Sequence, residues 1–570
     1  AHTVSTALLH HRLAITMAFM GLIAYAGGAG EQFATGLLAA ALLVLAFFYR
    51  PSEDTVARLE RIWLPLALLL VARAVFHAFV LRDDLVLPVV DLLLLLLVAE
   101  GFRPTNAQND ARLYALSFAL LLAATAYRPG LLYAVGFAGY VGLAVPTFMI
   151  GHLKRQAVEH GHMPPSIPRS FLLKSALGSL AVLGMAIAVF VLFPRASNAW
   201  SGNVPGPVAS VAGFRDRVAL GAHGATIGSN PAVVLRVEFP QGRPGGEVPL
   251  YWRGRSYDRF DGRVWSRSRG MPLPSAPPAS WYESAWTGTP IRQEIYATPL
   301  DTRVLFALHP LLRVESEGGI QPIFDNVGDW SYWGRGAQAY AAYSGATAPP
   351  PEHLRAAEGR FMPPPSRFLQ LPDLSPRLAV LASQIVGDAD NTYDKAIRIR
   401  DWFHREFAYT LDLPDTPAEA TLEHFLFERR AGHCEYFSTA MAVMLRTLGV
   451  PTREVNGFLG GEWNEFGGYL AVTQNQAHSW VEVWFPGYGW LTFDPTPPGS
   501  AADGEALSWQ WPGRFLVDGI RHRWNKWVLD YDAGVQISLL DDMRASMDGT
   551  GPASTQSDDS GIPRWILWLG

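Results

Sequence analysis

A series of long apolar runs fills the first third of this 570-residue chain and constrains its fold more than any other feature. A helix needs roughly 20 apolar residues to cross the hydrocarbon core of a membrane. The runs therefore predict an N-terminal bundle of transmembrane helices. Six or seven spans are possible, because the second, fourth and fifth runs are short. The runs lie at 13–29, 34–49, 63–81, 85–99, 112–127, 130–150 and 171–193.

One carboxylate lies inside these runs. Asp91 falls in the run at 85–99, where an unpaired charge is costly in lipid. We expect its side chain to face other helices, close to Arg73 in the preceding run. A role in transport or in a proton relay is the alternative.

Basic residues are unevenly distributed between the loops that join the runs. Arg50, Arg58 and Arg61 follow the second run and Lys154 follows the sixth, whereas the alternate loops carry few basic residues. Because basic loops stay in the cytoplasm, the N-terminus is expected there. Seven spans would then place everything after Phe193 outside the cytoplasm.

Composition separates two halves of the chain. Hydrophobic residues make up 49% and charged residues 17%, and the apolar excess ends near Phe193. The formal net charge of −5 and the lack of Lys or Arg blocks do not indicate nucleic-acid binding. We expect the sequence to be trimmed at both ends, with a further span beyond Gly570. The predicted domains are a transmembrane helical domain, an extracytoplasmic β-rich module, a Pro-rich linker, a catalytic domain, a C-terminal extension and the start of a truncated span, at 1–195, 196–347, 348–375, 376–500, 501–560 and 561–570.

Short alternating runs after Val233 predict an all-β module. Residues 233–239, 250–254 and 292–296 show the alternation of half-buried strands, and turn residues separate them. An aromatic cluster also lies in the module. We expect it to pack in the core or in a hairpin, and a substrate platform is the alternative. Its members are Tyr257, Phe260 and Trp265.

The chain has one cysteine, Cys434, and so cannot form an intrachain disulfide. The thiol is then either a buried apolar group or a nucleophile. Apolar residues recur every three or four positions after it, which predicts a helix that begins at Cys434, is buried along one face and ends at Gly449. Unpaired N–H groups at the start of a helix favour an anion, so this position should stabilise a thiolate.

Two further residues favour a catalytic interpretation of the thiol. Strands are predicted on either side of a turn, and a reversal centred near Pro486 puts His478 opposite Asp494. Directly opposed residues have Cβ atoms about 5 Å apart, so the carboxylate can hold the imidazole. Cys434, His478 and Asp494 are therefore predicted as a Cys-His-Asp triad.

His433, next to the cysteine, is expected to be a polar residue at the rim of the site, and tuning of the thiolate is the alternative. No metal site is predicted, because there is one cysteine and no histidine pair with ligand spacing near it. The sequence also lacks a loop with the spacing of an EF-hand, so calcium dependence is not expected.

Several motifs together resemble the transglutaminase-like Cys-His-Asp superfamily. They are Gly432-x-Cys434-Glu435-x-Phe437, Gly449-Val450-Pro451-Thr452-Arg453, His478-Ser479-Trp480-Val481-Glu482-Val483-Trp484 and Asp494-Pro495-Thr496. The resemblance narrows to the bacterial membrane-anchored transglutaminases of the TgpA-like family through the apolar N-terminal half and Tyr251-Trp252-Arg253-Gly254.

This resemblance implies a fold, a location and roles for the site residues. An α+β, papain-like catalytic domain would follow the helical bundle and the β module, and would face the periplasm from a multi-pass anchor in the bacterial inner membrane. Cys434 would be the nucleophile, His478 the general base and acid, and Asp494 the orienting carboxylate. His433 departs from the aromatic or small residue expected there, which leaves the local tuning of the thiol open.

Three functions stay open from the sequence. The resemblance implies an acyl transferase of the protein-glutamine γ-glutamyltransferase type. The same triad would serve a periplasmic cysteine hydrolase that acts on protein or cell-wall peptides, and a non-catalytic membrane scaffold is the third. The expected partners are a protein or peptide substrate with glutamine or amide groups, cell-wall peptides among them, and the lipid bilayer. No nucleic acid and no cofactor is expected.

Overall fold

The computed structural model contains two compact units, and each is described by itself. The first contains the described residues up to 192 and those from Ile520, and the second contains those from 214 to 519. The structure describes residues 6–26, 33–81, 86–103, 106–125, 130–161, 167–192, 214–221, 230–246, 248–273, 289–298, 302–316, 320–334, 339–345, 348–357, 366–411, 421–498, 513–524 and 526.

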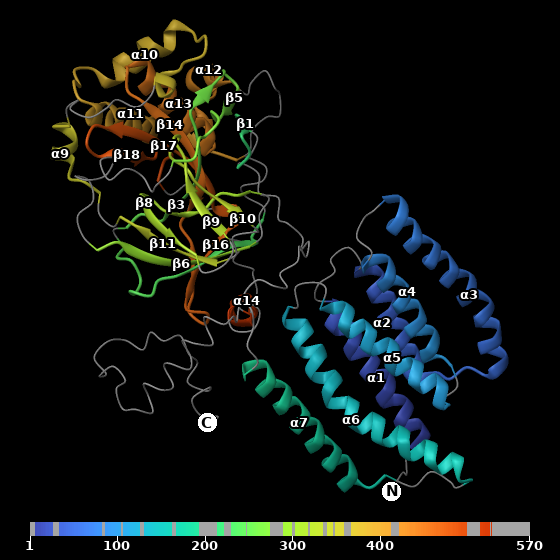
Figure 1. Ribbon diagram of the computed structural model, residues 1–570. Helices are drawn as coiled ribbons and strands as arrows, with labels where there is room; N and C mark the ends of the chain where they lie inside the picture. The colour runs from blue at the N-terminus through green and yellow to red at the C-terminus, as the bar shows by residue number, and fades with distance from the viewer. Residues whose placement is uncertain are drawn as a thin grey trace, which may run out of the picture. The chain divides into compact units, whose positions relative to one another are not determined.

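One helix lies in each of the seven apolar runs of the first unit (Figure 1). The helices are α1 (Thr6–Ala26), α2 (Phe33–Phe48), α3 (Glu53–Phe76, continued by a π-helix His77–Leu81), α4 (Val86–Gly101), α5 (Ala107–Ala124), α6 (Leu131–Glu159) and α7 (Arg169–Leu192). Among the described residues, α1, α3, α6 and α7 are long and apolar enough to cross a membrane, judged by length and composition.

The first helix begins at Thr6, earlier than the apolar run predicts. His10 and His11 interrupt the apolar pattern, but both are buried. His11 Nε2 lies 2.9 Å from the carbonyl oxygen of Ala46 in α2, and His10 Nε2 lies 2.5 Å from the hydroxyl of Tyr114 in α5. Because each ring makes a hydrogen bond to a neighbouring helix through Nε2, the helix continues through both residues.

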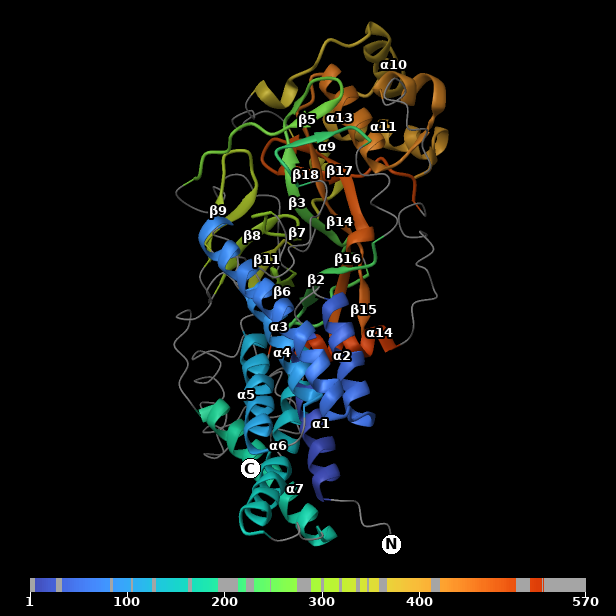
Figure 2. The same ribbon diagram turned by 90° about the vertical axis from the view of Figure 1, so that its right-hand side faces the viewer.

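The predicted proximity of Asp91 and Arg73 is confirmed. The guanidinium of Arg73 in α3 donates a hydrogen bond of 2.7 Å to Asp91 Oδ2 in α4. The ion pair offsets the cost of placing a carboxylate in an apolar helix. Elsewhere in this unit, α1 packs against α2, α5 and α6 (Figure 2).

Two sheets form the centre of the second unit. Their strands are β2 (Val233–Glu238), β3 (Tyr251–Tyr257), β6 (Ile291–Ala297), β7 (Ala307–Leu308), β8 (Leu311–Glu315), β11 (Ala339–Ser344), β14 (Thr452–Leu459), β15 (Glu462–Asn464), β16 (Tyr469–Thr473), β17 (Ala477–Phe485) and β18 (Gly489–Phe493). One sheet has the order β18-β17-β14-β3-β7, and the other the order β15-β16-β2-β6-β11-β8. Each sheet thus combines strands from both halves of this unit's sequence.

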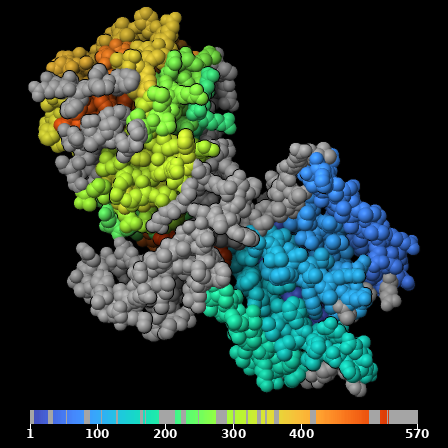
Figure 3. Space-filling view, in the orientation of Figure 1, coloured from blue at the N-terminus to red at the C-terminus, as the bar shows by residue number. Residues whose placement is uncertain are grey.

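The β-rich segment 196–347 and the catalytic segment 376–500, predicted as successive domains, therefore share their sheets. β3 pairs antiparallel with β14, so that Tyr251 lies beside Leu459. Surface from the earlier part (green to yellow) and from the later part (orange) belongs to this one unit (Figure 3). Local patterns predict each strand but carry no signal for its distant partner, so the sequence could not show that the segments are joined.

Helices gather at one end of the second unit, and β6 and β11 lie toward the other (Figure 1, Figure 2). They are α10 (Pro376–Val386), α11 (Thr392–Glu406), α12 (Leu422–His424, continued by a π-helix Phe425–Arg429) and α13 (Cys434–Thr447). α13 contacts β14 and β17 on one side and α10 and α11 on others. It is buried at every position from Cys434 to Arg446, so the predicted burial along one face only is wrong.

The aromatic cluster predicted to pack in the core does so. Tyr257, Phe260 and Trp265 are at most 2% exposed and belong to the apolar core around α13. Trp265 Nε1 also donates a hydrogen bond of 2.9 Å to Thr439 Oγ1 on that helix. The β-rich segment therefore helps to fix the position of α13.

The described parts of the predicted Pro-rich linker, 348–375, contain two short helices. α9 (Pro351–Arg355) buries Leu354 in the core around α13, and a 3₁₀ helix (Ser366–Leu369) buries Phe368. Proline density alone favours a stiff spacer. The apolar residues between the prolines anchor this segment to the second unit instead.

α14 (Gly513–Trp524) lies in the predicted C-terminal extension 501–560. Arg236 of β2 donates two hydrogen bonds, of 3.1 and 2.6 Å, to the carboxylate of Asp518. The hydroxyl of Tyr469 donates to the same carboxylate. These contacts fix the first half of α14 to the six-stranded sheet. The predicted truncated span at 561–570 lies outside the described residues.

Candidate active site

Cys434 is the first residue of α13 and is fully buried. The preceding residue, His433, is extended, with φ −102° and ψ 176°, and its side chain makes no capping hydrogen bond to the helix. The thiol therefore lies at the positive end of a long buried helix, as predicted. Such a position stabilises a thiolate relative to a thiol.

His478 and Asp494 come from neighbouring strands, but not in the predicted register. β17 and β18 pair so that Trp484 lies opposite Trp490. The reversal therefore centres on Gly487, whose φ of +80° favours glycine, one residue after the proline on which the predicted pairing is centred. In the observed pairing, the residue opposite each of His478 and Asp494 therefore differs by two positions from the predicted one. A shift of two residues keeps both side chains on the same face of the sheet. His478 Nε2 still lies 2.8 Å from Asp494 Oδ2, so the predicted contact forms diagonally across the strands.

The Asp494 carboxylate accepts hydrogen bonds from two other groups. The backbone N–H of Thr496 donates to Oδ1 at 2.9 Å. The hydroxyl of Tyr251 on β3 donates to Oδ2 at 2.9 Å. Sequence analysis did not identify Tyr251 as a site residue, because nothing local connects β3 with a carboxylate 243 positions away.

The electrostatics of the site favour a charged pair. Burial by itself would raise the pKa of Cys434, but the imidazoles of His433 and His478 favour the thiolate and lower the pKa to about 6. Burial would lower the pKa of His478, but Asp494 and the thiolate raise it to about 10. Burial also opposes ionisation of Asp494, yet His478 lowers the pKa of that carboxyl. Near pH 7 the site therefore holds a thiolate and an imidazolium beside a carboxylate.

A buried carboxyl group, Glu454 on β14, lies against α13. It accepts hydrogen bonds from the hydroxyls of Ser438, at 2.9 Å, and Thr439, at 3.2 Å. Burial raises the pKa of Glu454 to about 8 in spite of these bonds. Most of this carboxyl group is then protonated at pH 7, so it adds little negative charge to oppose the Cys434 thiolate.

His433 is fully buried, so its predicted place at a polar rim is wrong. Neither ring nitrogen makes a hydrogen bond to another described residue, and Glu435 Oε2 lies 3.9 Å from Nδ1. The ring packs edge-on against Tyr436, with centroids 5.1 Å apart. The other interpretation made from the sequence, tuning of the thiolate, fits this position.

Replacing His433 with phenylalanine is expected to raise the pKa of Cys434 by about one pH unit, or about 1.4 kcal/mol, because one of the two imidazoles that favour the thiolate is lost. The pH dependence of alkylation by iodoacetamide measures this, and the single cysteine leaves no background. His424→Phe is the matched control, since His424 is partly exposed and pairs with Glu428. An unchanged alkylation profile in His433→Phe would exclude the tuning role.

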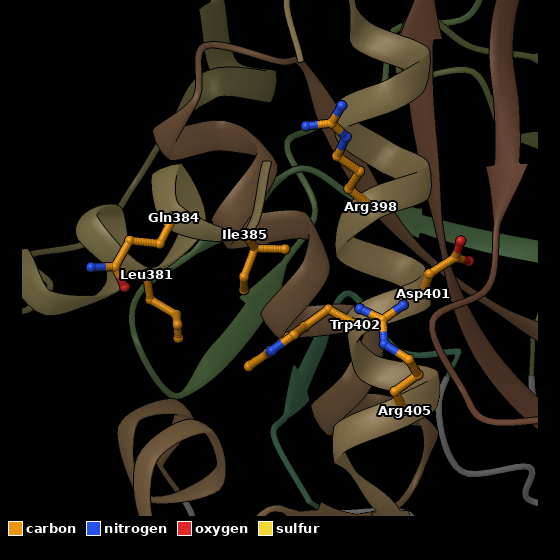
Figure 4. Close-up of a pocket in the computed structure, with 7 residues that line it drawn as sticks. All are labelled: Leu381, Gln384, Ile385, Arg398, Asp401, Trp402 and Arg405. Atoms are coloured by element: carbon orange, nitrogen blue, oxygen red, sulfur yellow. The ribbon is translucent and has the colours of Figure 1, made fainter. Parts of the chain in front are cut away.

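Two of the cavities in the described part of the second unit differ in the residues that line them. One, of about 530 Å³, is lined by α10 and α11 and contains none of the predicted triad residues (Figure 4). The other, of about 740 Å³, is bordered by Asp494 and Tyr251, with Arg400 and His404 also in its wall. A cavity therefore reaches the candidate site from the side of its carboxylate.

Comparisons with known proteins match both parts of the chain. Residues 13–351 match the model of the TgpA N-terminal domain, and residues 379–495 match that of the transglutaminase-like superfamily. A protein-glutamine gamma-glutamyltransferase of Pseudomonas aeruginosa is 30% identical over 416 residues, which cover 65% of this chain and 57% of that protein. The uncharacterized protein YebA of Bacillus subtilis is 43% identical over 138 residues, which cover 23% of this chain and 19% of that protein.

A solved structure is also similar. The crystal structure of the periplasmic domain of TgpA from Pseudomonas aeruginosa is 31% identical, with a TM-score of 0.42, over 50% of this chain and 96% of that chain. The chain spans 57% of the length of the first curated relative and 19% of the second.

The two matched regions cover the features on which the site depends. The N-terminal match extends over more than half of the 570 residues and includes β3 with Tyr251. The second match includes Cys434, His478 and Asp494. The chain belongs to the TgpA-like family, in which a TgpA N-terminal domain is joined to a transglutaminase-like domain.

Proposed function

We propose that this protein is a membrane-anchored acyl transferase that acts on glutamine carboxamides through Cys434, His478 and Asp494. The observation that carries the proposal is a thiol at the start of a buried helix whose pKa, in spite of burial, is lowered to about 6 by two imidazoles. The transglutaminase-like domain and the activity of the Pseudomonas relative support this reaction class.

The proposed reaction has two steps. The Cys434 thiolate attacks the amide carbon of a glutamine side chain, and backbone N–H groups at the start of α13 stabilise the oxyanion. The C–N bond then breaks, and ammonia leaves with a proton from His478. In the second step an amine attacks the thioester and gives a proton to His478, which forms an isopeptide bond and restores the thiolate and imidazolium.

The burial of the site supports transfer over hydrolysis. Cys434 is 0% exposed and His478 is 4% exposed. A thioester formed there has limited access to water, and exclusion of water protects reactive intermediates from hydrolysis. An amine that binds at the site can therefore compete with water for the acyl group.

We also propose that α1 to α7 anchor the chain in the bacterial inner membrane, with the second unit in the periplasm. Four of these helices have the length and apolar composition of membrane spans. Basic residues lie at one end of the second and sixth helices: Arg50 follows α2, and Lys154 lies near the C-terminal end of α6. This distribution favours a cytoplasmic N-terminus. Protein, lipoprotein and cell-wall peptides are the substrates available to that face.

Amine incorporation tests the proposed function. The full chain in detergent is incubated with a glutamine-rich protein such as casein and a fluorescent primary amine, beside Cys434→Ala. We expect covalent label with the wild type and none with the variant. Label that persists in Cys434→Ala would overturn the assignment of the nucleophile. Ammonia or peptide fragments without label would identify a hydrolase, and no product at all would contradict an acyl transferase.

A further inference from the structure

The Tyr251 hydroxyl and the His478 ring bind the same atom. Tyr251 donates to Asp494 Oδ2 at 2.9 Å, and His478 Nε2 lies 2.8 Å from that oxygen. Tyr251 belongs to the region matched by the TgpA N-terminal domain and lies outside the transglutaminase-like match at 379–495. The TgpA N-terminal domain therefore supplies the hydroxyl that binds the Asp494 carboxylate next to His478.

The position of Tyr251 follows from strand pairing. β3 lies beside β14 in the sheet that also contains β17, and Tyr251 is paired with Leu459. Its ring packs at a steep angle on Trp480, with centroids 5.1 Å apart, and lies 6.5 Å from the ring of His478. Burial, followed by the charge of Asp494, raises the pKa of Tyr251, so the hydroxyl stays protonated and can donate at any working pH.

The Asp494 carboxylate needs such a donor because it borders a cavity. Its side chain is 15% exposed, whereas that of His478 is 3% exposed. The cavity of about 740 Å³ has both Tyr251 and Asp494 in its wall. Water in that space could compete for the carboxylate and let it rotate away from the imidazole. A hydroxyl fixed by a strand holds Oδ2 in one place, while the Thr496 N–H holds Oδ1.

We propose that Tyr251 is a positioning residue for the triad: its hydroxyl orients Asp494, and through it His478, so that the TgpA N-terminal domain completes the site of the transglutaminase-like domain. This inference rests on the proposed function for its catalytic meaning. Its geometric content, the orientation of the His478 ring toward the thiol, can be measured without any substrate.

Tyr251→Phe in the full chain tests this role, since it removes the hydroxyl and keeps the ring. Tyr257→Phe is the matched control: Tyr257 is on the same strand and is fully buried, but donates to the backbone carbonyl of Arg215 at 2.8 Å. Loss of a hydrogen bond to a charged group should lower kcat for amine transfer about tenfold in Tyr251→Phe, with KM unchanged. Tyr257→Phe should keep the wild-type kcat.

Alkylation of Cys434 by iodoacetamide provides a second measurement. A poorly held imidazolium stabilises the thiolate less, so the alkylation profile of Tyr251→Phe should move to higher pH, while that of Tyr257→Phe stays with the wild type. Thermal midpoints of both variants check that they are folded. A wild-type kcat and alkylation profile in a folded Tyr251→Phe would overturn the proposal, and so would equal changes in both variants.

The two measurements separate this proposal from the proposed function. If the wild type incorporates no amine, the acyl transferase assignment fails, but the alkylation profiles still decide whether Tyr251 orients the site. If the wild type incorporates amine and Tyr251→Phe does so at the same rate, the positioning role fails and the function stands.

Discussion

If His478 belongs to the proposed triad, its replacement with alanine is expected to lower kcat for amine transfer by a factor of about 10⁴ to 10⁶, because the three residues of a triad act as a unit. The double variant Cys434→Ala with His478→Ala should be no less active than Cys434→Ala alone. Replacement of His424, a partly exposed histidine that pairs with Glu428, should leave the rate unchanged.

The pH dependence follows from the same pair. The thiolate forms as pH rises through about 6, and the imidazolium loses its proton as pH rises through about 10, so activity should be highest between these values. In His478→Ala, burial raises the pKa of the thiol, and only His433 and the start of α13 oppose it. Alkylation of Cys434 should then need a pH well above 6. An unchanged alkylation profile in His478→Ala would show that the two side chains do not form the predicted pair.

The parts of the site that local patterns encode could be predicted from the sequence. The helix that begins at Cys434 follows from a 3.6-residue apolar period, and the hairpin with His478 and Asp494 follows from alternation on both sides of a turn. The register was predicted wrongly by two residues. The contact between the two side chains was not lost, because a shift of two residues preserves the face of a strand.

Other parts depend on contacts between distant segments, and no local pattern contains them. Tyr251 reaches Asp494 only because β3 pairs with β14. The burial of His433 depends on the elements that enclose the start of α13. Seven apolar runs gave seven helices, but the start of α1 was missed because His10 and His11 make hydrogen bonds to neighbouring helices that the sequence does not show.

Replacement of Glu482 with glutamine is expected to cost about 3–5 kcal/mol of stability, the usual cost of removing one partner from a buried ion pair. Glu482 is fully buried on β17, four residues after His478. Arg253 of β3 donates to Oε1 at 2.8 Å, and Arg453 of β14 donates to Oε2 at 2.5 Å. These three strands are adjacent in one sheet, so the carboxylate joins both segments of the second unit next to the candidate site.

The pH dependence of this loss distinguishes a charge effect from a packing effect. Burial would raise the pKa of Glu482, but Arg253 and Arg453 lower it to about 2. A lowered pKa stabilises the fold above the ordinary value of 4.5, and this contribution is lost as pH falls toward 2. The thermal midpoint of Glu482→Gln should therefore lie well below that of the wild type at pH 7, and the gap should narrow as the medium is acidified.

The matched control is Glu465→Gln, which removes an exposed partner of Arg243 and should leave the thermal midpoint unchanged. If the difference in thermal midpoint between the wild type and Glu482→Gln stays constant from pH 7 to pH 3, the loss of stability comes from poor packing of the amide and not from the lost charge. Equal midpoints at pH 7 would contradict the role of this carboxylate in holding β3, β14 and β17 together. β3 also carries Tyr251, which donates a hydrogen bond to Asp494. If Tyr251 has the proposed positioning role, Glu482→Gln should therefore also lower amine transfer at temperatures below its thermal midpoint.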